Sequence, residues 1–151
     1  MTKSWGPCTW FLFHTLAEKI KEEEFNNNKE ILLKLIVRIC DNLPCPDCAG
    51  HARQQMANLN NNTIKTKQDL KNMLHSFHNI VNQRLNKPTF TIEELNNKYT
   101  LSITSNVVQY FIQIWSKRSH NPKLMTEDLH KSRVVNEFIK WWQQNYHLFN
   151  P

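Results

Sequence analysis

The sequence predicts an all-α protein, a bundle of four to five helices followed by a helical C-terminal extension. Apolar residues recur with a period of about 3.6 along most of the chain, which is typical of helices that bury one face. The 151 residues include only two glycines, Gly6 and Gly50, whereas sheet-rich and nucleotide-binding α/β folds need many for turns and phosphate loops. The one strand-like stretch, residues 89–92, is too short to matter.

Three helices are predicted in the N-terminal half. The first covers residues 10–24, and we expect the cluster Asn26–Asn28 to break it, because asparagine clusters favour loops. The second runs from about residue 29 to residue 42 and ends before Pro44, since proline removes a backbone donor. The third begins at Pro46, because proline fits the first turn of a helix.

The C-terminal half is predicted to contain one long helix and three further helical segments. The long helix spans about residues 67–86 and shows the clearest apolar stripe of the chain, with Pro88 as a stop signal. A Thr-x-x-Glu capping box at Thr91 opens a short helix. A further helix covers about 107–115, and the last one opens at Thr126.

Composition and charge limit the classes of function. The net charge of +6 is scattered, without a block of like charges, so nucleic-acid binding is not expected. No apolar run reaches the ~20 residues that a membrane helix needs, and the N-terminus lacks the apolar segment of a signal peptide. We therefore expect a soluble cytoplasmic protein without a membrane partner. The one expected boundary divides a main domain, 1–116, from an extension of unknown role, 117–151.

Cys45 and Cys48 form a C-x-x-C pair at the predicted start of a helix. Unpaired backbone N–H groups and the helix dipole favour a thiolate at this position. Two intervening residues bring the sulfur atoms within bonding distance, so the pair can close to a disulfide and open again. The pattern predicts a redox-active dithiol.

Spacing alone leaves three other interpretations of the pair open. A thioredoxin-like site needs an adjacent β-α-β pattern, which is absent. A structural zinc site could use Cys40, Cys45, Cys48 and His51, although Cys40 lies on an apolar stripe and fits a core position more simply. A reversible disulfide in a helical sensor or scaffold without a cofactor is the third possibility.

Two further groups of residues suit the binding of an aromatic, phosphorylated cofactor. Residues 78–87 gather histidine, asparagine and lysine at one helix end, although an ordinary solvated helix end shows the same pattern. Trp10 and His14 form an i, i+4 pair in which the indole could stack on a ring and the imidazole could hydrogen-bond to it. Taken alone, the pair is better explained as a core tryptophan beside a satisfied core histidine.

Together these features resemble the Erv/ALR family of FAD-linked sulfhydryl oxidases, in particular the versions encoded by large cytoplasmic DNA viruses. The order and the intervals match over about residues 5–115. The resemblance rests on W-G-P at 5–7 followed by Trp10 and His14, on L-P-C-P-D-C at 43–48 followed by His51, and on H-N-x-V-N-x-R-L-x-K-P-x-F at 78–90.

The resemblance implies a four-helix bundle with a short fifth helix, which holds FAD at one end and commonly forms a homodimer. It implies an oxidase that forms disulfides in dithiol proteins and reduces O2 to hydrogen peroxide, with Cys48 facing the flavin and Cys45 exchanging with substrate. No metal is implied. The residues implied to line the FAD site are Trp10, His14, His51, His78, Asn79, Val81, Asn82, Leu85, Lys87, Phe90 and Tyr99.

The chain departs from the family pattern in its cysteines. Many relatives carry another structural disulfide and a second, shuttle C-x-x-C, but no cysteine follows Cys48 here. A pairing of Cys8 with Cys40 is a further possibility that only geometry decides. Without a shuttle pair, the expected substrate is another small dithiol protein, or a virion protein, that approaches Cys45 directly.

Overall fold

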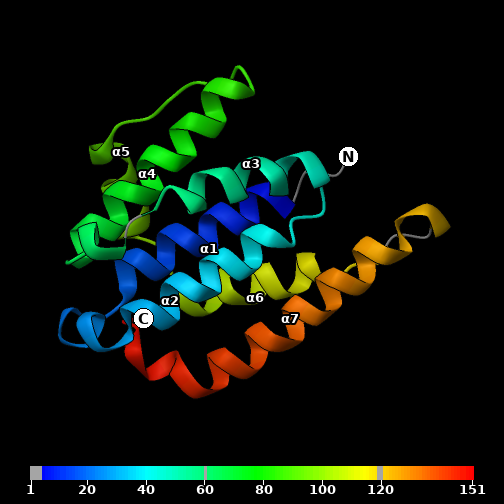
Figure 1. The fold of residues 1–151 in the computed structure, drawn as a ribbon. Coiled ribbons are helices and arrows are strands. Elements are labelled where there is room, and N and C mark those ends of the chain that lie inside the picture. Colours follow the sequence, from blue (N-terminus) through cyan, green and yellow to red (C-terminus); the bar gives the residue numbers. More distant parts are fainter. Residues whose placement is uncertain (1–4, 60, 119–120) are drawn as a thin grey trace.

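The computed structural model describes residues 5–59, 61–118 and 121–151, and these residues form helices joined by short connections (Figure 1). The only β pairing among them is an isolated bridge between Ile20 and Phe149. The predicted all-α class is therefore confirmed. The α-helices are α1 (Trp5–Lys19), α2 (Glu22–Asp41), α3 (Pro46–Ala57), α4 (Lys67–Arg84), α5 (Ile92–Tyr99), α6 (Thr104–Trp115) and α7 (Met125–Asn145). Short 3-10 turns are η1 (Asn61–Thr63), η2 (Pro122–Leu124) and η3 (Tyr146–Leu148).

Helix α1 lies at the centre of the fold. It packs against α4 and α5 on one side and most extensively against α6 on another, while α2 packs against α3 and α7. In Figure 1, α6 and α7 accordingly lie across α1 and α2 from α4 and α5. Leu12 and Leu16 of α1 are fully buried. None of the helices in the described part of the chain has the length and apolar character to cross a membrane.

The Asn26–Asn28 cluster was predicted to form a loop, and this prediction is wrong. It lies inside α2, whose first turn carries three glutamates that complement the helix dipole. Phe25 is buried, and the Asn28 side chain donates to the Glu24 carbonyl oxygen, so the cluster is held within the helix. The chain turns earlier, at Ile20, after which α2 begins at Glu22.

The junction of α4 and α5 has a specific local geometry. Asn86 adopts a left-handed φ of 57°, and the Lys87 N–H donates to the Asn82 carbonyl at 2.8 Å, which is the Schellman ending of a helix. Helix α4 therefore stops at Arg84. Leu85 caps it and is 49% exposed, so it does not extend the buried stripe of this helix.

Helix α6 is part of the central core. Trp115 is 1% exposed, and its indole N–H donates to the Thr9 hydroxyl of α1 at 3.0 Å. Phe111 is fully buried and meets Phe138 of α7 edge-on, with ring centroids 5.0 Å apart. The extension beyond residue 116 thus shares a hydrophobic core with the preceding helices.

Candidate active site

Cys45 and Cys48 lie at the start of α3, as the sequence predicted. Cys45 is the N-cap residue, with extended backbone angles, and Pro46 occupies the first turn. The Cys48 amide N–H donates to the Cys45 sulfur at 3.2 Å. Because this amide has no partner within the helix, the Cys45 sulfur satisfies it and receives the positive end of the helix dipole.

The surroundings of the Cys48 thiol favour its protonated form. Burial, followed by the hydrogen bond and the negative charge of Cys45, raises the pKa of Cys48 to about 11. Arg84, at the end of α4, acts in the opposite direction and lowers it. In the reduced pair, Cys48 therefore keeps its proton at neutral pH.

A cluster of aromatic and imidazole rings lies between α1 and α4. Trp10 stacks on His78 with ring centroids 4.0 Å apart and an angle of 6° between planes. His14, one turn after Trp10, has its Nε2 atom 2.9 Å from Nδ1 of His78. Phe90 and Tyr99 contact the His14 ring from the connector after α4 and from α5. The structure thus brings five of the predicted FAD-lining residues together.

Both histidines of this cluster are neutral. Burial is the largest cause and holds the pKa of His14 well below its usual range, and it lowers the pKa of His78 to about 4. Each neutral ring carries one N–H group, so one ring donates a hydrogen bond to the other across the 2.9 Å contact. The Nδ1 atom of His14 is buried and has no hydrogen-bond partner among the residues that the structure describes. An unpaired polar atom inside an aromatic cluster suits a ligand with ring heteroatoms.

The remaining predicted residues lie around this cluster in different environments. Asn82 is buried, Val81 packs partly against the core, and Asn79 contacts the backbone of the connector. His51 is exposed on α3, and Lys87 is exposed after α4.

Two residues near these rings were missed from the sequence. His75 contacts the Phe90 carbonyl with Nε2 at 2.6 Å, and Phe77 meets Trp10 edge-on at 5.0 Å. Phe77 belongs to the apolar stripe of the helix, a pattern that predicts burial but not contact with Trp10. His75 lies four residues before Asn79 on the same helix face, and this i, i+4 spacing was the available signal.

The zinc interpretation is not favoured. No group of three or more His, Cys, Asp or Glu side chains in the described parts of the chain is arranged to hold a metal. Cys40 is 1% exposed, as expected for a core residue, and burial raises its pKa to about 12, whereas zinc needs a thiolate. Cys8 is also buried, and neither thiol is in a disulfide.

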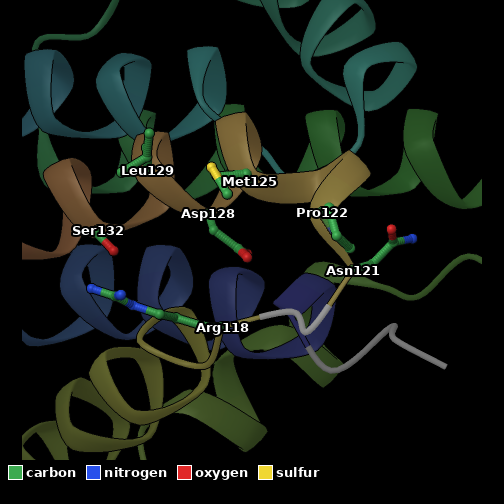
Figure 2. Close-up of a pocket in the computed structure, with 7 residues that line it drawn as sticks. All are labelled: Arg118, Asn121, Pro122, Met125, Asp128, Leu129 and Ser132. Carbon is green, nitrogen blue, oxygen red and sulfur yellow. The ribbon is translucent and has the colours of Figure 1, made fainter.

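A cavity of about 230 Å³ lies at the start of α7, away from the predicted site residues. Figure 2 shows Asp128 and Ser132 of α7 on one side of it, facing Arg118 of the preceding segment. A second cavity of about 280 Å³ lies between α2 and α7. Neither is lined by the dithiol or by the ring cluster.

Comparison with known proteins identifies a family whose matched segment includes both the dithiol and the ring cluster. The model of the Erv1 / Alr family matches residues 7–100. An African swine fever virus "FAD-linked sulfhydryl oxidase" is 32% identical over 116 residues, which are 74% of this chain and 96% of the viral protein. The rice "FAD-linked sulfhydryl oxidase ERV1" is 28% identical over 94 residues, 62% of this chain and 48% of the plant protein. No solved structure matches.

Proposed function

The chain belongs to the Erv1/Alr family, and we propose that it is an FAD-dependent thiol oxidase with Cys45 and Cys48 as its redox-active pair. The observation that carries this proposal is that one chain combines a helix-capping dithiol at the start of α3 with a neutral, aromatic histidine cluster between α1 and α4. Both lie within the segment that the family model matches.

The residues of the cluster fit a flavin nucleotide. Flat rings of Trp10 and His78 suit stacking on an aromatic ring, and the unpaired Nδ1 atom of His14 suits a ring heteroatom. Asn82 would supply an amide and Lys87 a positive charge for the polar part of the cofactor. FAD, when bound, accepts two electrons from the dithiol and passes them to O2, which yields hydrogen peroxide.

Cys45 is the residue that exchanges with substrate in this proposal. A substrate thiolate attacks the Cys45 sulfur of the oxidised pair, a mixed disulfide forms, and Cys48 leaves as the thiolate. A second substrate thiolate then attacks the substrate sulfur of the mixed disulfide and releases Cys45. The substrate leaves as a disulfide, and its two electrons remain on the Cys45–Cys48 dithiol.

Cys48 changes its acidity during this exchange. In the mixed disulfide, Cys45 carries no negative charge, so two of the causes that raise the pKa of Cys48 are removed. The opposing effect of Arg84 remains. Cys48 is therefore easier to ionise at the stage at which it is displaced as the thiolate, which makes it a better leaving group.

The substrate class and the setting extend this proposal. Pro46 and Asp47 are exposed beside Cys45, which suits direct approach of a dithiol protein without a shuttle pair. We extend the proposal to a homodimer that acts in the cytoplasm of a host cell, as the resemblance to the versions of large cytoplasmic DNA viruses implies. Mass measurement in solution tests the dimer.

The deciding experiment is the spectrum of the purified protein. We expect a yellow protein whose flavin absorbance bleaches under a dithiol and recovers in air. Cys45→Ser and Cys48→Ser should each abolish thiol oxidation while the protein still folds and holds FAD. Cys8→Ser is the matched control and should retain turnover. Full activity in Cys45→Ser or Cys48→Ser would contradict the roles assigned to these cysteines. A colourless protein with stoichiometric zinc would favour the zinc-binding module instead.

A further inference from the structure

The connector between α4 and α5, residues 85–91, is fixed at both of its ends. The left-handed Asn86 turns the chain back on itself after α4. At the other end, the Thr91 side chain accepts from the Glu94 amide while Glu94 accepts from the Thr91 amide, which confirms the predicted capping box. The path of the residues between these points depends on their hydrogen bonds to side chains of α4.

Side chains of α4 hold the Phe90 peptide on both of its polar atoms. The Asn79 amide donates to the Phe90 carbonyl at 2.8 Å, and the Phe90 N–H donates to the Asn79 side-chain oxygen at 3.1 Å. A carbonyl only accepts, so the 2.6 Å contact from Nε2 of His75 fixes the proton on that nitrogen. The Phe90 carbonyl therefore accepts two hydrogen bonds, both from one face of α4.

These bonds determine where the Phe90 ring lies. The ring is edge-on to His78, with centroids 4.9 Å apart, and to His14, with centroids 6.1 Å apart. Its neighbours Thr89 and Thr91 are exposed, and Phe90 itself is only partly buried. Since core packing on this connector is slight, hydrogen bonds to its backbone have the larger share in fixing the ring.

We propose that His75 and Asn79 are positioning residues, which act through the Phe90 peptide to set one wall of the FAD site. The inference rests on the proposed function, because it assigns these residues a role toward the flavin cofactor. It also changes the role of Asn79. The side-chain oxygen and one N–H of Asn79 are occupied by Phe90, so Asn79 shapes the site by holding the connector rather than chiefly by contacting the cofactor.

The test compares FAD binding by the full chain after its cofactor has been removed. Loss of one neutral hydrogen bond costs about 1 kcal/mol, so His75→Leu should weaken FAD binding roughly fivefold and Asn79→Leu, which loses two, roughly 30-fold. His75→Gln should restore much of the affinity, because a glutamine amide can donate to the same carbonyl. Phe90→Leu should resemble Asn79→Leu, since both remove the positioned ring.

A second readout separates positioning from a contribution to stability alone. At saturating FAD, His75→Leu and Asn79→Leu should change the visible circular dichroism of the flavin, which reports the asymmetry of its surroundings. Asn72→Leu, at an exposed position of the same helix, is the matched control and should leave both readouts unchanged. If either variant loses only thermal stability and keeps wild-type FAD affinity and dichroism, the proposal is overturned.

Failure of the oxidase proposal would give a different result from failure of the positioning role. If the wild-type protein binds no FAD, the oxidase assignment and the positioning role fall together. If the wild type binds FAD and His75→Leu binds it equally well, only the positioning role falls. Should Asn79→Leu fail to fold, the comparison of His75→Leu with His75→Gln still decides the question.

Discussion

The pKa of the Cys48 thiol depends on three identified residues, and each can be changed separately. After burial, the hydrogen bond and charge of Cys45 raise the pKa of Cys48, and Asp47 raises it further, whereas Arg84 lowers it. Cys45→Ala should therefore shift the pKa of Cys48 below about 11. Arg84→Gln in the same background should shift it upward again. The pH dependence of alkylation at Cys48 measures both, and identical titrations would contradict this description.

The histidine cluster should make the folded state sensitive to acid. The pKa of His78 is about 4 in the folded chain, below its ordinary 6.5, so protons bind the unfolded chain more readily between these values. The contribution of neutral His78 to the free energy of unfolding is complete above pH ~6.5 and is lost as the pH falls toward ~4. The loss is roughly 2 kcal/mol after allowance for the partial exposure of the ring. His14 acts in the same direction.

Urea unfolding between pH 7 and pH 4 measures this effect. His78→Gln should flatten the acid-dependent loss of stability, whereas His147→Gln, at an exposed position, should leave it unchanged. An equally steep loss in His78→Gln would show that other groups cause it.

At the scale of helices, a substitution in α6 tests whether this helix belongs to the core. Phe111 is fully buried between Trp115 and Phe138, so Phe111→Ala should reduce the free energy of unfolding by about 3–5 kcal/mol. Gln113→Ala, exposed on the same helix, should change it by less than about 0.5 kcal/mol. Denaturant titrations compare the two. Similar midpoints for both variants would mean that α6 is not a core helix.

The sequence predicts helices well where local signals and burial agree. Helix α4 follows its apolar stripe, and α5 begins at the Thr91 capping box as expected. The Asn26–Asn28 cluster misled, because asparagine favours loops locally while Phe25 and the glutamates before it favour continuing the helix. The actual turn at Ile20–Lys21 depends on distant residues, since the Lys21 N–H donates to the Leu148 carbonyl at 2.9 Å.

For the whole molecule, the spacing of motifs identified the family and the cofactor, and the family match confirms both. The gathering of Trp10, His14 and His78 followed from the order of those motifs. The role of His75 did not follow, because it depends on the path by which a connector returns along α4. Periodicity reports which face of a helix is buried, and it says little about which backbone carbonyl will lie opposite that face.

The segment beyond residue 116 was expected to be an extension of unknown role, and its contacts lead to a prediction for the whole chain. Val134 and Phe138 of α7 are buried, and the end of the chain holds the α1–α2 turn through the Asn150 N–H, which donates to the Lys19 carbonyl at 2.7 Å. Truncation after Ser116 removes these contacts and leaves the Phe111 side of α6 uncovered. The truncated protein should therefore unfold at lower denaturant concentration and associate in solution.

Far-UV circular dichroism and light scattering test this expectation against a mild change at the same interface. Arg38 and Glu137 form an exposed ion pair between α2 and α7, at 2.8 Å, and such pairs contribute at most about 1 kcal/mol. Arg38→Gln should thus leave the unfolding midpoint and the molecular mass nearly unchanged, while truncation alters both. A truncated chain that unfolds like the full-length protein, at the same oligomeric state, would mean that residues 1–116 form an independent domain. The shared burial of Phe111 and Phe138 argues against that outcome, because Phe138 of α7 packs directly on Phe111 of α6.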